Sequence, residues 1–120
     1  MAYLINKRKI INDPVYGFIS IPGDFVFDLI EHHWFQRLRN IKQLGITNFV
    51  YPGANHTRFQ HGLGALHLME MAISTLRSKG TEISPEEEEA TYIAILLHDI
   101  GHGPFSHSLE NSIIHGITHE

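Results

Sequence analysis

The chain has 120 residues, of which 42% are hydrophobic and 18% charged, and its formal net charge is −4 at pH 7. This composition is typical of one globular domain and excludes a wholly disordered chain, a collagen-like chain and a membrane-spanning bundle, since no apolar run approaches roughly 20 residues. The absence of cysteine excludes a disulfide framework and a thiolate ligand or nucleophile. A reducing cytoplasm is the simplest location.

Charge is unevenly distributed along the chain. All nine Lys and Arg residues lie in residues 1–79 with five acids, which leaves +4, whereas residues 80–120 hold eight acids and no Lys or Arg, which gives −8. A positive half suits a phosphate-bearing partner, and a negative half suits a metal ion. The alternative is that the acids from Glu86 to Glu89 form one solvated run.

The sequence of the first third of the chain predicts an extended arm followed by short helices. Residues 8–22 are rich in Ile, Val, Tyr and Phe and contain Asp-Pro and Gly breakers, which predicts two short strands or an extended arm. Residues 24–44 predict two short helices with a break near His33. Asp24 is the expected N-cap and Gly45 the expected stop.

A long helix follows a loop. Residues 46–56 contain Pro, Gly and Asn and predict the loop. Thr57 with Gln60 forms a capping box, and Gly80 ends a helix expected over residues 57–79. Its apolar positions recur at helical spacing: Gly62, Ala65, Leu66, Met69, Ala72, Ile73 and Leu76.

A second helix start lies at Ser84, where proline follows at the first turn and Glu87 completes a capping box. Gly101 is the expected stop, and a further helix is expected over 106–115. The apolar stripe of the second helix is Ala90, Ile93, Ala94 and Leu97. The chain is therefore expected to be mostly α-helical.

Histidine is the residue type most indicative of a functional site, because five of the ten histidines lie in residues 98–120. Imidazole is the commonest transition-metal ligand and the usual acid or base near neutral pH. Asp99, in the last turn of a predicted helix, faces the negative end of the helix dipole at a cost of up to ~1 kcal/mol. A cation bound beside His98 and Asp99 would reverse that cost. His61, with Gly62 and Gly64 beside it to permit close helix approach, would complete a three-ligand set. The alternative is an exposed aspartate and packed histidines.

Three further side chains could act beside the same ion. His102 and His107 lie in the turn and at the start of the next expected helix, where an acid, a base or a phosphate-binding group would face it. Arg58 lies one helical turn before His61 and could stabilise phosphate charge.

These residues together resemble a known family. Four segments carry the match: KIINDPVYG (9–17), FQRLRNIKQLG (35–45), YPGANHTRFQHGLG (51–64) and HDIGHGPFSH (98–107). The chain resembles the HD-domain metal-dependent phosphohydrolases and, among them, the deoxynucleoside triphosphate triphosphohydrolase branch. The resemblance implies an all-α HD-domain helical bundle, incomplete at the C-terminus, with a short extended or β-hairpin arm over 1–23 and the N-terminal part of the HD domain over 24–120.

The resemblance also implies roles for individual residues. His61, His98 and Asp99 are implied to bind a divalent metal ion (Mn, Fe, Mg or Zn). Arg58 and His107 are implied to bind substrate phosphate. The implied catalytic residues are His102, His119 and Glu110, the last standing where relatives have an acid that orients the catalytic histidine. The implied reaction is attack of metal-activated water on the α-phosphorus, which releases a nucleoside and triphosphate.

Relatives imply further partners. A guanine nucleotide is implied to bind as an activator at Lys9, Asn12, Glu31, Gln36 and Arg39. The alternative is that Arg37, Arg39 and Lys42 form only a solvated basic helix face. Relatives assemble as homo-oligomers, no membrane partner is expected, and the negative net charge gives nucleic-acid binding little support.

The sequence departs from the family in one respect. The family's fourth ligand is an aspartate well downstream, and this sequence ends at Glu120 before any such residue. The expectation is therefore a truncated phosphohydrolase. The alternatives are a catalytically inactive nucleotide-binding or interaction module with the HD fold, or an HD phosphodiesterase with another substrate.

Overall fold

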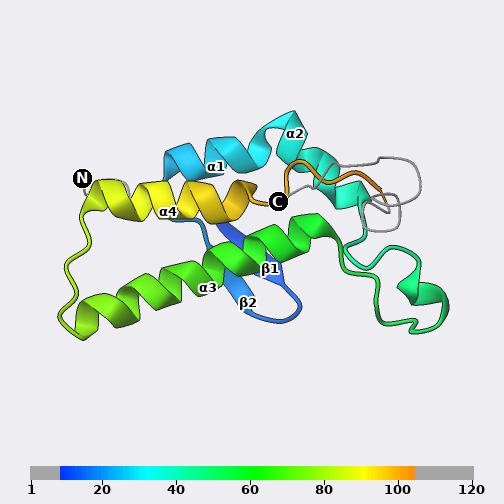
Figure 1. Cartoon of the computed structure of the whole chain (residues 1–120), viewed down its shortest axis with the longest axis horizontal. Helices are drawn as coiled ribbons and strands as arrows, with labels where there is room; N and C mark the ends of the chain where they lie inside the picture. The colour runs from blue at the N-terminus through cyan, green and yellow to red at the C-terminus, as the bar shows by residue number, and fades with distance from the viewer. Residues whose placement is uncertain (1–8, 105–120) are drawn as a thin grey trace, which may run out of the picture.

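The structure is a computed structural model that describes residues 9–104, and it consists of helices with one small β-hairpin (Figure 1). The elements in chain order are β1 (Ile10–Asp13), β2 (Gly17–Ser20), α1 (Asp24–Glu31), α2 (His33–Gln36), the 3₁₀ turns η2 (Arg37–Asn40) and η3 (Thr47–Phe49), α3 (Arg58–Ser78) and α4 (Pro85–Leu97). This confirms a mostly helical chain with an N-terminal hairpin. The helix expected over 106–115 lies outside the described residues.

The hairpin forms as the sequence predicts. β1 and β2 pair antiparallel with Ile11 opposite Ile19. The turn is fixed by Asp13, whose Oδ2 accepts hydrogen bonds from the backbone N–H of Val15 (2.9 Å) and Tyr16 (3.0 Å). One face of β2 points inward, so that Ile19 is fully buried and joins the helical core.

The helical segment predicted over residues 24–44 begins at a different N-cap and ends earlier than predicted. Gly23, at φ +122°, is the N-cap of α1, so Asp24 lies in the first turn and the N-cap prediction was wrong. The break falls at His32, which has an extended backbone. The helical stretch ends at Asn40 rather than at Gly45, because the carbonyl of the extended Ile41 accepts a hydrogen bond from the Arg58 N–H at 2.8 Å. A tertiary contact therefore overrides local helix propensity.

The long helix α3 begins where its capping box predicts. Thr57 Oγ1 accepts from the Gln60 N–H (3.2 Å), and Gln60 Oε1 accepts from the Thr57 N–H (2.9 Å). Gly80 follows its end at φ +94°. Of the predicted apolar stripe, Gly62, Leu66 and Ile73 are buried and Ala65 and Met69 half-buried, whereas Ala72 and Leu76 are exposed.

The helix α4 begins as predicted but buries a different face. Ser84 Oγ accepts from the Glu87 N–H at 3.1 Å. Ala90 and Ala94 are exposed, and Tyr92 and Leu96 are buried instead. The run from Tyr92 to Leu97 is apolar throughout, so its periodicity could not fix which side faces α3. The helix ends at Leu97, before the stop expected at Gly101, and the Glu86–Glu89 run is exposed except at Glu88.

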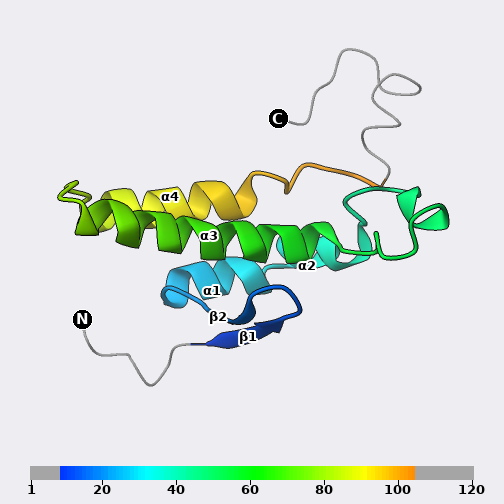
Figure 2. The same cartoon turned by 90° about the horizontal axis from the view of Figure 1, so that it is seen from below.

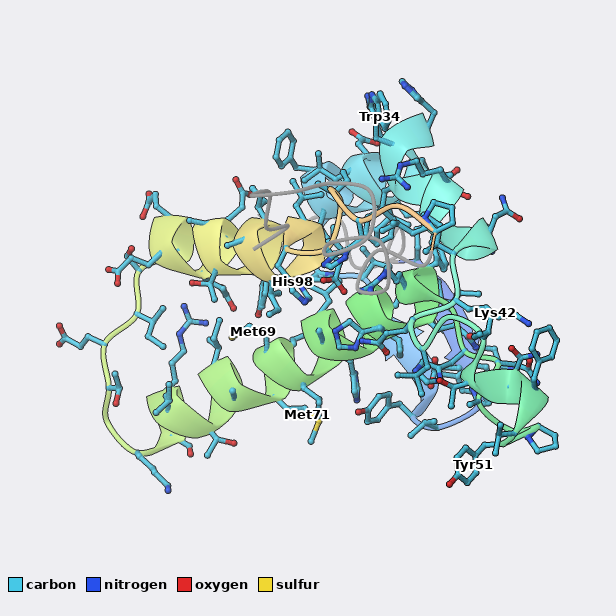
Figure 3. All side chains as sticks on the ribbon, turned by 45° about the vertical axis from the view of Figure 1, so that its right-hand side comes forward. Trp34, Lys42, Tyr51, Met69, Met71 and His98 are labelled. Atoms are coloured by element: carbon cyan, nitrogen blue, oxygen red, sulfur yellow. The ribbon has the colours of Figure 1, made fainter. Side chains whose placement is uncertain are left out.

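The hydrophobic core lies between the hairpin and the helices. Figure 2 shows the hairpin on the opposite side of the molecule from α4, with α3 between them. The buried hydrophobic residues are Ile19, Ile21, Val26, Ile30, Phe35, Leu38, Ile41, Phe59, Leu63, Leu66, Ile73, Tyr92 and Leu96. Trp34 and Tyr51 point outward instead (Figure 3). Within residues 9–104, none of the helices has the length and apolar character needed to cross a membrane.

Candidate metal centre

The first turn of α3 faces the last turn of α4, because the two helices form an antiparallel hairpin. His61 lies beside His98 there, with 5.3 Å between the ring centroids. A Cβ atom at the neighbouring Gly62 would lie 3.7 Å from the Leu96 carbonyl oxygen of α4, an ordinary contact, but only 3.1 Å from the Phe35 ring, so this glycine makes room for Phe35 of α2. The tight contacts expected at the glycines therefore face Phe35 of α2 and, at Gly64, Tyr16 of the hairpin rather than α4.

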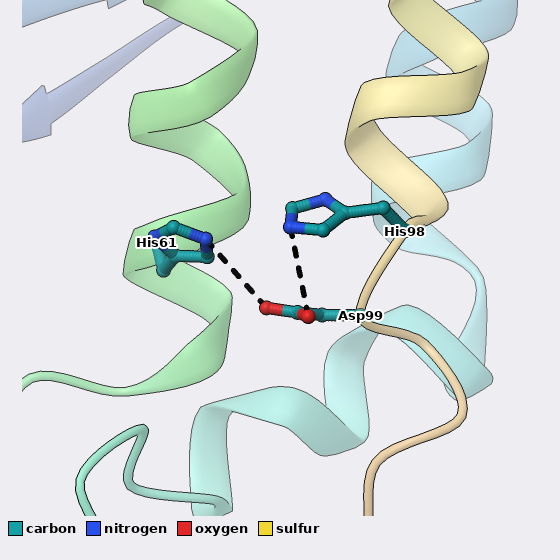
Figure 4. A group of neighbouring side chains, drawn as sticks. All are labelled: His61, His98 and Asp99. Carbon is teal, nitrogen blue, oxygen red and sulfur yellow. Dashed lines mark ion pairs between the residues drawn. The ribbon is translucent and has the colours of Figure 1, made fainter. Parts of the chain in front are cut away.

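Asp99 completes a group of three possible ligands (Figure 4). One donor atom from each of His61, His98 and Asp99 lies within 4.8 Å of the other two. The Nε2 atoms of His61 and His98 lie 3.6 Å and 3.5 Å from the two carboxylate oxygens of Asp99. Tetrahedral donors about 2.1 Å from one ion would lie about 3.4 Å apart, so these side chains fit a divalent metal ion.

Both imidazoles are prepared to act as ligands. The Nδ1–H of His98 donates to the Ile95 carbonyl at 2.6 Å, which leaves the Nε2 lone pair directed to the group. Burial is the largest influence on His61 and lowers its pKa below 6.5; the carboxylate of Asp99 opposes this, while His98 and Arg58 add to the lowering. His61 is therefore held in the neutral form that binds metals.

Two more predicted residues surround the carboxylate of Asp99. Arg58 is 4% exposed, and its Nη1 lies 3.2 Å from Asp99 Oδ2. The Arg58 Nε is buried and has no hydrogen-bond partner among the described residues. His102 is 1% exposed, and its Nε2 lies 3.4 Å from Asp99 Oδ1. Asp99 is therefore a buried charge compensated from several sides.

Four of the five residues predicted to bind a guanine nucleotide line one cavity. This cavity, of about 540 Å³, lies between the hairpin, α1 and the start of α3. Lys9, Asn12, Glu31 and Arg39 are among its lining residues. Gln36 is not, but its Oε1 accepts a hydrogen bond from Arg39 Nε at 2.7 Å. The Arg39 guanidinium also lies 3.9 Å from the centre of the Phe59 ring.

The basic residues near α2 do not form one solvated face. Lys42 is exposed and donates to Asn55 at 3.2 Å. Arg37 instead reaches the turn after Asp99, where it donates to the carbonyl oxygen of His102. This contact of Arg37 was not predicted, and no local sequence pattern could have indicated it. His107, Glu110 and His119, which were predicted to bind or act on the substrate, lie outside the described residues.

A family model described as the HD domain matches residues 58–120, which include His61, His98 and Asp99. The chain belongs to the HD domain family. In the structure, this HD domain region provides both limbs of the α3–α4 hairpin and all three possible ligands.

Named relatives resemble the chain over most of its length. It is 44% identical over 107 residues to the deoxynucleoside triphosphate triphosphohydrolase SAMHD1 homolog of Dictyostelium discoideum, covering 88% of this chain and 21% of that protein. It is 40% identical over 112 residues to human deoxynucleoside triphosphate triphosphohydrolase SAMHD1, covering 92% of this chain and 18% of that protein. The chain thus spans about a fifth of the length of these HD domain relatives.

A solved structure resembles this HD domain chain closely. It is a phosphohydrolase from Bacteroides thetaiotaomicron, 60% identical in sequence, which superposes with a TM-score of 0.89. The match covers 93% of this chain and 28% of that one. At that identity and score, the two chains share the fold over the matched residues.

Proposed function

We propose that this chain forms part of a metal-dependent phosphohydrolase that acts on (deoxy)nucleoside triphosphates and releases nucleoside and triphosphate. The observation that carries the proposal is the meeting of His61, His98 and Asp99 at one end of the α3–α4 hairpin. The names of the relatives as deoxynucleoside triphosphate triphosphohydrolases support the substrate class.

His61, His98 and Asp99 would hold the metal ion. A divalent ion at such a site polarises a phosphoryl oxygen and lowers the pKa of bound water. Two imidazoles and one carboxylate form a mixed nitrogen and oxygen donor set, which suits Mn, Fe or Zn and tolerates Mg. The buried position of Asp99 excludes water from one side of the carboxylate and keeps its charge concentrated at the ligand group.

Arg58 and His102 would assist from beside the carboxylate. Arg58 carries a permanent positive charge beside the ligand group, which supports its role as a hydrogen-bond donor to phosphate. His102 contacts the Asp99 carboxylate on its other oxygen and would hold it in place as well as serve in proton transfer. His107 is proposed to contact phosphate, and His119 with Glu110 to complete the acid–base group.

The cavity beside the hairpin is proposed to bind an activating guanine nucleotide. The Glu31 carboxylate can accept hydrogen bonds from the donors on a guanine edge, and Arg39 can donate to its acceptors. Lys9 adds a positive charge for phosphate. Apolar side chains exposed on the same arm support self-association: Ile10, Val15 and Phe18 are each more than 60% exposed.

The deciding experiment measures metal content and reaction products of the intact protein. We expect about one transition-metal ion per chain by elemental analysis, with loss of the ion in His61→Ala. His67→Ala is the matched control, because His67 lies on the same helix but contacts Tyr16 instead. With a deoxynucleoside triphosphate, we expect inorganic triphosphate as product. Wild-type protein without metal would indicate an inactive nucleotide-binding module, and monophosphate products or turnover of cyclic nucleotides alone would indicate a phosphodiesterase.

A further inference from the structure

One arginine outside the ligand group forms hydrogen bonds with the turn that carries Asp99. Arg37, at the start of η2, donates from Nη2 to the carbonyl oxygen of Ile100 at 2.8 Å and to that of His102 at 2.6 Å. These partners are 63 and 65 residues later in the chain. Arg37 therefore joins the α2–η2 segment to the turn that follows α4.

The backbone N–H groups of this turn make local hydrogen bonds. Residues 98–104 form no helix or strand. The Ile100 N–H donates to Leu97 and the His102 N–H donates to Asp99, both at 3.1 Å. These bonds shape the turn but do not attach it to the remainder of the molecule, whereas the Asp99 side chain joins it to α3 through Arg58. The two bonds from Arg37 also attach it, through the carbonyl groups of the 100–101 and 102–103 peptides.

The position of Arg37 is itself well defined. Its side chain is half-buried, and its guanidinium lies 5.7 Å from the centre of the Trp34 ring, in reach of a cation–π contact. Bonds from a charged donor are stronger than those between neutral groups, and one nitrogen that serves two carbonyl oxygens fixes their relative direction. The direction of those carbonyls sets the backbone next to Asp99, and hence where its carboxylate points.

We propose that Arg37 is a positioning residue of the metal centre, which raises affinity for a divalent ion by holding the turn that presents Asp99. The inference rests on the proposed metal centre. Groups that orient metal ligands from outside the ligand shell typically change metal affinity by about 10–100-fold when they are lost. Arg37→Ala should therefore raise the Kd for the ion by about that factor while the stoichiometry stays at one.

Arg77 offers a matched control for the general loss of stability. Its Nη2 also donates to a loop carbonyl, that of Ile83, at 2.8 Å, but at the far end of the α3–α4 hairpin. Arg77→Ala removes the same kind of contact at a distance from the ligands. It should lower the thermal midpoint and leave the Kd within about twofold of wild type, well below the 10–100-fold expected for a ligand-orienting group.

The experiment titrates Mn²⁺ into the intact, chelator-treated protein by calorimetry and records thermal unfolding of each variant in excess chelator. The inference is supported if Arg37→Ala weakens Mn²⁺ binding far more than Arg77→Ala at a similar loss of thermal midpoint. It is overturned if wild type binds Mn²⁺ and Arg37→Ala binds it equally well, or if both variants weaken binding alike.

A second variant covers misfolding of Arg37→Ala. Arg37→Lys keeps a charged donor but lacks the guanidinium reach, so it should fold and show a smaller rise in Kd; an unchanged Kd in folded Arg37→Lys, with Arg37→Ala unfolded, would overturn the inference. If wild type itself binds no Mn²⁺, the proposed metal centre falls together with the inference, which distinguishes that failure from a failure of Arg37 alone.

Discussion

Substituting Asp99 by asparagine should destabilise the fold even when no metal ion takes part. Asp99→Asn keeps the shape of the side chain and removes its charge, which leaves the Arg58 guanidinium buried without its partner. The side chains of Arg58 and Asp99 are 4% and 8% exposed, and the pairing distance is 3.2 Å. Water can therefore replace little of the lost interaction.

The expected magnitude follows from that geometry. Two unit charges 3.2 Å apart attract by about 5 kcal/mol at an effective dielectric constant of about 20. Removal of one partner of a buried pair typically costs about 3–5 kcal/mol, because the other charge stays buried. We expect this loss for Asp99→Asn and a similar loss for Arg58→Met. The double variant should lose less than either single variant, because it leaves no unpaired buried charge.

The assay is urea unfolding followed by far-ultraviolet circular dichroism, in excess chelator so that metal binding adds no stability. The matched control is the pair Arg77 and Glu88, whose 3.1 Å distance is nearly the same but whose side chains are 39% and 27% exposed. A double-mutant cycle on Arg77→Met and Glu88→Gln should give a coupling energy below about 1 kcal/mol. A coupling at Arg58–Asp99 no larger than that of the control would refute the argument from burial.

Two further predictions concern the helices that present the ligands. Leu96→Ala should lower the free energy of unfolding by about 2–5 kcal/mol, because Leu96 is fully buried between α4 and α3. Leu76→Ala, at a side chain that is 45% exposed, is the control. Equal losses at both positions would contradict the packing described. Thr57→Ala removes one half of the capping box and should cost about 1 kcal/mol, measured by the same urea unfolding. Thr57→Ser, which keeps the hydroxyl, should lose much less than Thr57→Ala.

Helix starts and the hairpin could be predicted because their signals are local. Thr57 and Ser84 each satisfy a backbone N–H three residues later, so a few adjacent letters contain the whole interaction. The turn at Asp13 is local in the same sense. The stop predicted at Gly45 failed because the end of the helical stretch depends on the bond between Ile41 and Arg58, which are far apart in sequence.

The candidate site likewise contains residues that local sequence patterns predict and one, Arg37, that they do not. An aspartate at a helix C-terminus and a histidine beside a glycine are visible in sequence, and the meeting of His61, His98 and Asp99 agrees with the prediction from those patterns and from the family resemblance. Arg37 was missed because its contacts cross 63 and 65 residues and leave no periodicity, cap or charge pattern. Which face of α4 is buried was missed because all positions from Tyr92 to Leu97 are apolar.

The α3–α4 hairpin is joined by the chain at one end only, through residues 79–84. At the other end, His61 and Asp99 meet with no covalent link between the limbs, so noncovalent contacts alone hold the two limbs together there. An ion bound by ligands from both limbs would cross-link them reversibly at that end. Amide hydrogens in the final turn of α4 would then exchange with solvent slowly while the ion is bound and faster after a chelator removes it. Those near Ser84 would keep their exchange rates.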